Sequence, residues 1–271
     1  MAHLRFKELI LIILRLLTSP LNSVMVKLHH ERLLVIIKSM YSKKWASVYG
    51  SKILAGKYLG LKLPSNLEAN RRDFMSIIIG NYEKGIIDVI TTGKFSTFVN
   101  IGSGDGVHLN GIAKLFPNSK CIGYEIDKKS IANQLWIREQ NNIKNVEIRG
   151  PMTCSEMYHL AYELRDVSSL ILCDIEGSEY EIFTSANLSL LTQCTIVIEL
   201  HEFSSLNQVK ARNLISVAAN FFDVQIMKHR GRIIESLEFL TGYSDDLFML
   251  LHSESRPSEM RYLILRPRVK S

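Results

Sequence analysis

One stretch, Phe98 to Asp127, limits what this chain can fold into more than any other. A short apolar run at 97–101 is followed by the glycine-rich sequence G-S-G-D-G at 102–106, and the residues after it carry apolar side chains at helical spacing. A second apolar run then ends at Glu125. A continuous apolar run is typical of a central parallel strand buried on both faces. The stretch therefore predicts a strand, a tight turn, a helix and a second strand.

The glycine-rich turn predicts a binding site for a nucleoside cofactor. Glycine accepts positive φ angles and lets a ligand approach the backbone closely, and the N–H groups at the start of a helix face outward. The spacing is G-x-G-x-G rather than the G-x-G-x-x-G of dinucleotide folds, and Asp105 lies inside the loop. A carboxylate is a poor neighbour for a pyrophosphate but suits a cationic amino group, such as that of S-adenosylmethionine. Glu125 is expected to accept the hydroxyls of a ribose.

Strand and helix patterns alternate regularly from residue 97 onward. The expected strands are 97–101, 120–125, 145–149, 169–174, 194–200, 222–228 and 261–266, and the expected helices are 107–117, 128–141, 153–165, 178–187 and 205–220. This alternation predicts an α/β fold with a doubly wound, mostly parallel, seven-stranded sheet, whose ligands bind outside the carboxyl ends of the strands. Residues 246–253 fit a helix with Ser244 as its N-cap, although a strand is also compatible.

The N-terminal third is expected to be a helical and basic extension, residues 1–95, followed by a catalytic domain at 96–271. The net charge of +6 is concentrated in this extension. Apolar runs at 9–17 and 33–40 predict two helices with basic flanks, and residues 70–92 are also expected to be helical. The run at 9–17 is too short to span a bilayer, which needs about 20 apolar residues. We expect both helices to pack on protein, with peripheral membrane contact through residues 1–45 as the alternative.

Composition narrows the classes of function. The four cysteines have no spacing that resembles a zinc site, and they fit reduced core thiols, so a cytoplasmic protein is expected. A basic chain without a nucleic-acid-reading motif does not predict a nucleic-acid partner. The expected partner is a small-molecule or glycan acceptor, and a homo-oligomer remains open.

Polar side chains at two strand ends predict the chemistry. Asp174 ends the fourth strand, while Glu199 and His201 share one face at the end of the fifth. Histidine has a suitable intrinsic pKa for taking a proton from a hydroxyl acceptor, so we expect His201 to be the base and Asp174 or Glu199 to orient it or hold the substrate. The same set could bind a divalent metal, but a site without a metal is favoured.

In these residues and the motifs around them, the segment from about 80 to 267 resembles the FkbM-type S-adenosylmethionine-dependent methyltransferases of the Rossmann-like class. The matching motifs are Asn81-Tyr82-Glu83, Val99-Asn100-Ile101-Gly102-Ser103-Gly104-Asp105-Gly106, Gly123-Tyr124-Glu125, Ile198-Glu199-Leu200-His201 and the D-x-E-G-x-E sequence Asp174-Ile175-Glu176-Gly177-Ser178-Glu179. The resemblance implies O-methylation of a hydroxyl on a sugar, glycan or secondary metabolite. Asn100 stands where the family usually has Asp, and Asp105 is expected to replace that carboxylate.

The motifs and the resemblance together give a full set of expected site residues. The candidate cofactor-binding residues are Glu83, Asn100, Gly102, Ser103, Gly104, Asp105, Gly106, Glu125, Ile126, Met152 and Asp174, and the candidate substrate-binding residues are Glu176, Glu202 and Arg256. Two other classes of function remain open beside the methyltransferase. One is a non-catalytic cofactor-binding or scaffold subunit that docks through its basic N-terminal region, and the other, disfavoured by the loop spacing, is a nicotinamide-dependent oxidoreductase.

Overall fold

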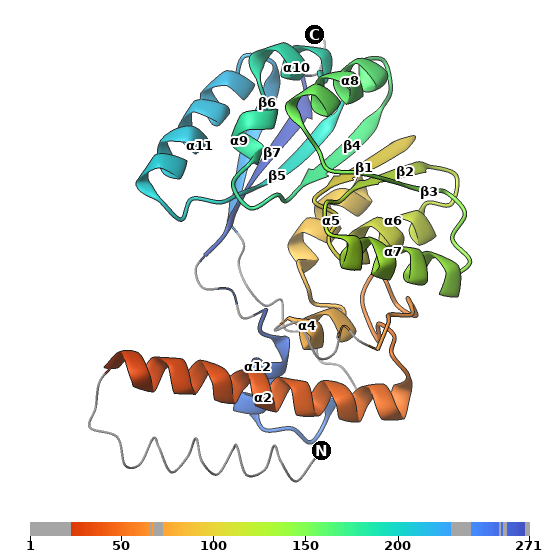
Figure 1. Ribbon diagram of the computed structural model, residues 1–271, viewed down its shortest axis with the longest axis vertical. Helices are drawn as coiled ribbons and strands as arrows, with labels where there is room; N and C mark the ends of the chain where they lie inside the picture. Colours follow the sequence, from red (N-terminus) through yellow and green to blue (C-terminus); the bar gives the residue numbers. More distant parts are fainter. Residues whose placement is uncertain are drawn as a thin grey trace.

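A seven-stranded sheet forms the centre of the computed structural model, which describes residues 23–65, 67, 73–228, 240–254, 256 and 259–268, with only the backbone of residues 23–32 (Figure 1). The strands are β1 (Thr97–Ile101), β2 (Lys120–Tyr124), β3 (Val146–Arg149), β4 (Ser169–Cys173), β5 (Thr195–Leu200), β6 (Phe222–Lys228) and β7 (Arg261–Pro267). Their order is β3-β2-β1-β4-β5-β7-β6; β7 runs antiparallel to both β5 and β6, and the pairs among β1 to β5 are parallel. The expected doubly wound, mostly parallel fold is confirmed.

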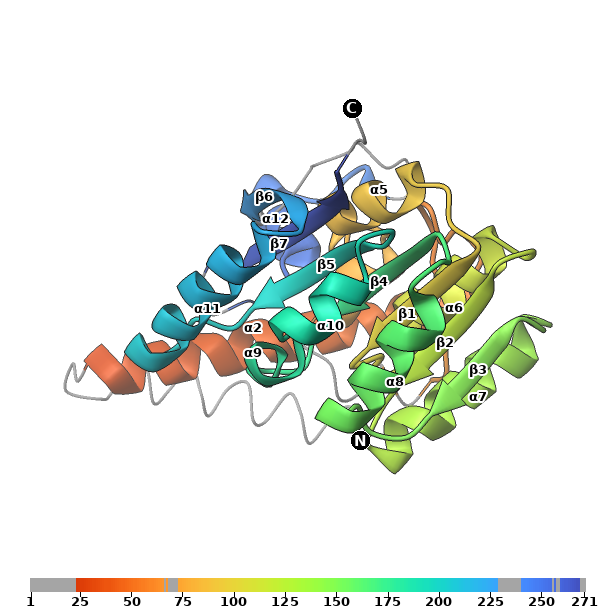
Figure 2. The same ribbon diagram turned by 90° about the horizontal axis from the view of Figure 1, so that it is seen from above.

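Helices cover both faces of this sheet (Figures 1 and 2). One face carries α5 (Lys84–Thr92), α6 (Val107–Leu115) and α7 (Lys128–Gln140), and the other carries α8 (Cys154–Leu164), α9 (Glu179–Ile182), α10 (Ser185–Leu190) and α11 (Ser205–Ala218). A third group, α2 (Ser23–Tyr49), α4 (Phe74–Ile78) and α12 (Asp245–His252), lies beneath the sheet and its members contact one another.

Alternating side chains of the strands form two hydrophobic cores. Phe98 of β1 belongs to the core under α5 and α6, whereas Val99 and Ile101 belong to the core under α8 to α11. All five residues of β1 are buried, as a central parallel strand requires. The carboxyl ends of β1, β4 and β5 consequently meet at one edge of the sheet, where Cys173 of β4 is paired with Ile198 of β5.

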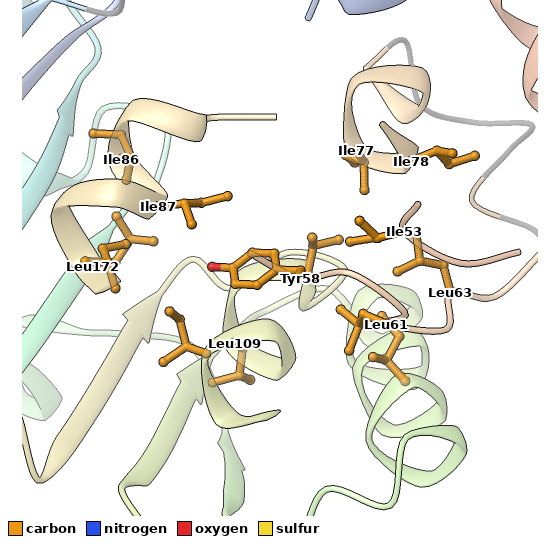
Figure 3. Packing of buried hydrophobic residues seen from close by; sticks show 14 of the residues in the cluster. Ile53, Tyr58, Leu61, Leu63, Ile77, Ile78, Ile86, Ile87, Leu109 and Leu172 are labelled. Atoms are coloured by element: carbon orange, nitrogen blue, oxygen red, sulfur yellow. The ribbon is translucent and has the colours of Figure 1, made fainter. Parts of the chain in front are cut away.

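The N-terminal extension packs into the first of these cores. Tyr58 lies among Ile53, Ile87, Leu109 and Leu172, so one cluster joins residues from both sides of the expected boundary at 95/96 (Figure 3). A Cβ atom at Gly111 would lie 2.6 Å from the Tyr58 ring. The expected division into 1–95 and 96–271 stays a prediction. In the structure, residues from both sides of this boundary share one hydrophobic core.

Helix α2 also packs on protein where its side chains are described. Trp45 is buried and its Nε1 donates to the hydroxyl of Tyr243 over 3.2 Å, and Lys38 Nζ donates to the carbonyl of Ser253 over 2.5 Å. Within the part of the chain that the structure describes, no helix combines the length and the apolar character needed to cross a membrane. The apolar run expected at 9–17 lies outside the described residues.

The structure corrects two of the expected helices and decides between the alternatives for a third segment. The helix expected at 70–92 is interrupted after α4, because Gly80 (φ 72°) and Glu83 (φ 47°) adopt left-handed backbone conformations. The helix expected at 178–187 is two short helices, since Thr184 caps a new start at α10. The helical alternative at 246–253 is confirmed: Ser244 caps α12 by accepting from the backbone N–H of Leu247.

Candidate functional site

The glycine loop that links β1 to α6 has the backbone conformation that its sequence predicts. Gly102, Gly104 and Gly106 have φ angles of 75°, 50° and 83°. A Cβ atom at Gly102 would lie 1.7 Å from the carbonyl oxygen of Asp174, and one at Gly106 would lie 2.5 Å from the Gln134 side chain. Nothing lies within 4 Å of a Cβ atom at Gly104. The outer glycines are therefore required for packing, whereas Gly104 faces open space.

Glu125 joins the end of β2 to this loop. One carboxylate oxygen accepts the N–H of Gly104 over 2.7 Å, and the other accepts the N–H groups of Ile126 and Asp127 over 2.8 Å each. Three backbone donors fix the carboxylate where a parallel sheet binds its ligands, outside a strand's carboxyl end. Glu125 thus holds the loop in shape, and its expected role in binding a ribose stays a prediction.

A cavity of about 440 Å³, the outer cavity, opens beside the loop. Its lining combines the loop with the ends of β2, β3 and β4: Gly102, Gly104, Tyr124, Glu125, Ile126, Pro151, Met152, Asp174, Ile175, Glu176 and Ser178. Of the candidate residues, Ile126 and Met152 contribute apolar surface, and Asp174 and Glu176 contribute carboxylates. This volume falls within the range of small-molecule and cofactor sites.

A smaller cavity of about 80 Å³, the inner cavity, shares Gly102, Gly104 and Asp174 with the outer one. It is lined by Tyr82, Glu83, Asn100, Gly102, Ser103, Gly104, Asp105, Gly106, Val107, His108, Leu172, Asp174, Glu199 and Tyr262. Asn100 is almost fully buried, and its Oδ1 has no hydrogen-bond partner among the described residues. A buried acceptor without a partner is costly, so this atom marks a place for a donor group of a ligand.

Arg256 holds three carboxylates at the rim of the inner cavity. Its guanidinium donates to Glu83, Glu199 and Glu254, with Nε to Glu254 at 2.8 Å. His108 Nε2 also lies 2.8 Å from Glu83. Burial opposes the charge of Glu83, but the hydrogen bond from His108 and the charges of His108 and Arg256 outweigh it, so the pKa of Glu83 lies well below its usual range. The expected cofactor residue Glu83 and the expected substrate residue Arg256 are therefore bound to each other.

Asp174 and Glu199 are neighbours at the ends of β4 and β5, as expected from the sequence. Burial, together with the nearby carboxylate of Glu83, raises the pKa of Asp174 to about 6. Burial and the carboxylates of Asp174 and Glu83 raise the pKa of Glu199 to about 8, in spite of its ion pair with Arg256. The edge of the sheet thus carries more negative charge than a buried site readily holds.

His201 is buried and is held by a residue that the sequence analysis did not place in the site. Its Nδ1 lies 3.1 Å from Oε1 of Glu179, and its backbone N–H donates to the same oxygen over 3.0 Å. Burial lowers the pKa of His201, but the Glu179 hydrogen bond and the charges of Glu179, Asp174 and Glu199 outweigh it and raise that pKa to about 9. The imidazole therefore carries a proton at neutral pH in this arrangement, which does not favour the expected role of base.

Two of the expected site residues, Glu202 and Asp105, are bound to other side chains, and Glu202 also lies outside both cavities. Glu202 forms an ion pair with Arg261, whose Nε donates over 2.6 Å, and it lines neither cavity. Asp105 lines the inner cavity and accepts from Asn133 Nδ2 over 2.8 Å. Glu179 is the last acid of D-x-E-G-x-E, but its place in the first turn of α9 is typical of a surface acid at a helix N-terminus, so the sequence does not mark it as a site residue.

Comparisons with known proteins agree with this fold. A family model described as "Putative methyltransferase" matches residues 94–168, which run from β1 through α8 and include the glycine loop and Glu125. The match covers well under half of the chain. No curated protein sequence matches the chain. The narrower resemblance to the FkbM-type family is not confirmed by these comparisons and stays a prediction.

Solved structures with similar folds have low sequence identity to the chain. The METTL16 methyltransferase domain ("delta-N METTL16 MTase domain") has a TM-score of 0.50 at 11% identity, over 86% of this chain and 95% of that one. A precorrin-6y C5,15-methyltransferase from Geobacter metallireducens GS-15 has a TM-score of 0.45 at 13% identity (68% and 89%). The O-methyltransferase TomG from Streptomyces achromogenes, solved in complex with SAM, has a TM-score of 0.43 at 9% identity (85% and 89%).

At these identities the likeness concerns the fold, and only the first of the three structures reaches a TM-score of 0.5. The fold is that of the Rossmann-like methyltransferases, with the sheet order described above. The family match over the glycine loop and this fold together support a methyltransferase that uses S-adenosylmethionine as its cofactor.

Proposed function

We propose that this chain is an S-adenosylmethionine-dependent O-methyltransferase whose acceptor is a hydroxyl of a sugar, a glycan or a secondary metabolite. The observation that carries the proposal is the meeting of the two cavities at Asp174. The outer cavity offers the glycine loop and Glu125 to a nucleoside, and the inner cavity offers buried polar groups to the amino-acid part of the same cofactor. Asp174 lines both cavities and has Glu176 and His201 beside it, so a donor and an acceptor could be held side by side there, which is the main requirement of a methyl transfer.

The residues present fit the cofactor. Glu125 would hold the ribose, and Ile126 and Met152 would flank the adenine with apolar surface in the outer cavity. The cationic amino group suits the partnerless Oδ1 of Asn100 and the carboxylate of Asp105. Gly104 leaves the space that a close backbone contact needs. When bound, the cofactor supplies an electrophilic methyl group on its sulfonium.

The acceptor would lie over Asp174, Glu176 and His201. Oδ1 of Asp174 is buried and has no hydrogen-bond partner within the described chain, so it is available to a hydroxyl. Phe203 lies next to His201, with ring centroids 5.7 Å apart, and its side chain is 60% exposed. An exposed aromatic ring beside polar groups suits the C–H face of a sugar, which supports a carbohydrate-like acceptor.

The experiment has a binding stage and a transfer stage. Calorimetric titration with S-adenosylhomocysteine and with NAD should give binding to the first alone. The protein is then incubated with methyl-labelled S-adenosylmethionine and pools of sugars, glycans and hydroxylated metabolites. Label in a methyl ether would support the proposal. Tight S-adenosylhomocysteine binding without transfer to any pool would favour the cofactor-binding scaffold, and label on nitrogen or carbon alone would contradict O-methylation.

A further inference from the structure

Two residues of the loop after β4 and one residue just after β5 place possible ligand atoms close together. Nε2 of His201 lies 3.4 Å from Oδ1 of Asp174 and 3.5 Å from Oε2 of Glu176, and the three atoms lie within 4.8 Å of one another. Two atoms that each lie about 2.1 Å from one ion, at angles between 90° and tetrahedral, are separated by about 3.0–3.4 Å. The two distances from Nε2 of His201 are therefore close to those between ligands of one cation.

The three groups form only long ion pairs with each other, and one buried oxygen among them has no hydrogen-bond partner within the described residues. The His201 side chain is only 3% exposed, yet within the described residues its Nε2 makes no hydrogen bond of acceptable geometry and only approaches the two carboxylates. Oδ1 of Asp174 is buried and likewise has no hydrogen-bond partner there. A buried acceptor without a partner, next to an imidazole nitrogen that makes no hydrogen bond of good geometry, indicates that a ligand belongs between them.

The other nitrogen of His201 is fixed in the manner of a metal-binding histidine. Nδ1 faces Glu179, whose side chain is fully buried and whose second oxygen accepts the N–H of Gly177 over 2.8 Å. Histidines that bind metals almost always donate their free ring N–H to a carboxylate, carbonyl or water, which orients the ring. This contact leaves Nε2 unprotonated and directed at Asp174 and Glu176 once a cation replaces the proton.

We propose that Asp174, Glu176 and His201 bind one divalent cation of the first transition row, for which an imidazole and two carboxylates are suitable ligands. A second group of acids, Glu83, Asp174 and Glu199, has similar spacing. It is a poorer candidate, because the guanidinium of Arg256 already binds Glu83 and Glu199.

The cation site faces the outer cavity, whose lining includes Asp174 and Glu176. Three protein ligands leave coordination positions open, and a hydroxyl oxygen bound there would have a lowered pKa. This consequence rests on the proposed O-methyltransferase activity, whereas cation binding does not. The two can therefore fail separately: transfer that survives exhaustive chelation would overturn the role of the cation in transfer, absence of cation binding would overturn the site, and cation binding without any transfer would overturn the activity alone.

The test measures cation binding directly on the full chain without an affinity tag. Protein freed of metal by chelation and dialysis is titrated with Mn²⁺, and free Mn²⁺ is followed by electron paramagnetic resonance. The wild type should show one saturable site. Loss of one ligand should weaken it by about 10-fold or more, as losses in a coordination sphere typically do. The variants are His201→Ala and Glu176→Gln; Glu176 is largely exposed, so its variant should fold normally.

Two neighbouring acids serve as matched controls. Glu181→Gln and Glu202→Gln remove carboxylates close in sequence to the ligands, but neither residue belongs to the group of three. Both should bind Mn²⁺ as the wild type does. Every variant should still unfold in one cooperative thermal transition in the absence of metal, at a lower temperature in His201→Ala because the buried Glu179 loses a partner there. No saturable Mn²⁺ binding in the wild type, or equal binding in His201→Ala, Glu176→Gln and the controls, would overturn the site.

Discussion

Oε1 of Glu179 receives two contacts from His201, one from the backbone N–H and one from Nδ1 of the ring. Glu179 has no exposed side-chain surface, so its charge is held by these contacts and by the N–H of Gly177. A buried carboxylate costs free energy unless it is fully hydrogen-bonded. The last acid of D-x-E-G-x-E thus sets where the imidazole points, and through it the shape of the site at Asp174.

Glu179→Gln should therefore cut turnover while leaving cofactor affinity close to that of the wild type. The amide cannot accept from all three donors, so the ring of His201 loses its orientation, and about 1–3 kcal/mol of stability is lost with a buried charged hydrogen bond. Glu181→Gln is the matched control, because Glu181 lies on the same short helix but is exposed. Turnover and S-adenosylhomocysteine titration are compared for both variants; equal turnover in the two would contradict a positioning role.

Gly104→Val should remove measurable S-adenosylmethionine binding while the protein stays folded. The new side chain would occupy the open space between the two cavities, although a β-branched residue is also strained at φ 50°. Gly50→Val controls for that strain, because Gly50 has φ 77° and open space but lies at the end of α2. Calorimetry on both variants should show loss of binding in Gly104→Val alone. Unchanged affinity in a folded Gly104→Val protein would remove the loop from the cofactor site.

Glu125→Ala should weaken S-adenosylhomocysteine binding by about 1–3 kcal/mol, the range for a hydrogen bond to a charged group. The structure adds a second cause, because the carboxylate also holds the N–H groups of Gly104 and Ile126. Glu139→Ala removes an exposed acid from α7 and should bind as the wild type does. An affinity within error of this control would mean that the ribose is held elsewhere.

The sequence was sufficient where local pattern decides structure. The alternation of apolar runs gave the strand positions, and the parallel sheet then required Asp174 and Glu199 to be neighbours, because their strands are paired up to Cys173 and Ile198. The glycine spacing likewise predicted a loop with positive φ angles. These features depend on contacts that are close in sequence or on the regular geometry of a sheet.

Contacts between distant segments could not be predicted in the same way. Arg256 reaches Glu83 and Glu199 from an irregular segment after α12, and no periodicity indicates such a contact. Glu83 is buried where a charged residue after a helix would be expected on the surface. Glu179 has the pattern of a helix N-terminal acid, and only the fold shows that the end of β5 covers it.

Arg256→Met should destabilise the protein by about 3–5 kcal/mol, the typical loss when one partner of a buried ion pair is removed. Glu83, Glu199 and Glu254 would be left together without their common cation. Arg261→Met is the control, because its pair with Glu202 is more exposed and should cost about 1 kcal/mol or less. Chemical denaturation of both variants gives the difference; equal losses would show that the buried cluster contributes no more than the exposed pair.

The last prediction concerns the groups that face the acceptor. Asp174→Asn and His201→Ala should each reduce turnover by about 10²-fold or more, the usual size for losing a group that contacts the reacting atoms. Because Nε2 of His201 and Oδ1 of Asp174 lie 3.4 Å apart and would act on one hydroxyl, the double variant should be little worse than the poorer single one. Cofactor affinity should change least in His201→Ala, since His201 lines neither cavity.

The measurement pairs single-turnover rates with S-adenosylhomocysteine titration for the two single variants and the double variant. Glu202→Gln is the control, because Glu202 follows His201 in sequence but is bound to Arg261. Additive losses in the double variant would mean that the two residues act at separate steps. If both single variants kept wild-type rates on the true acceptor, the hydroxyl would have to bind elsewhere, and Glu199 of the inner cavity, together with the Arg256 guanidinium bound to it, would be the next group to test.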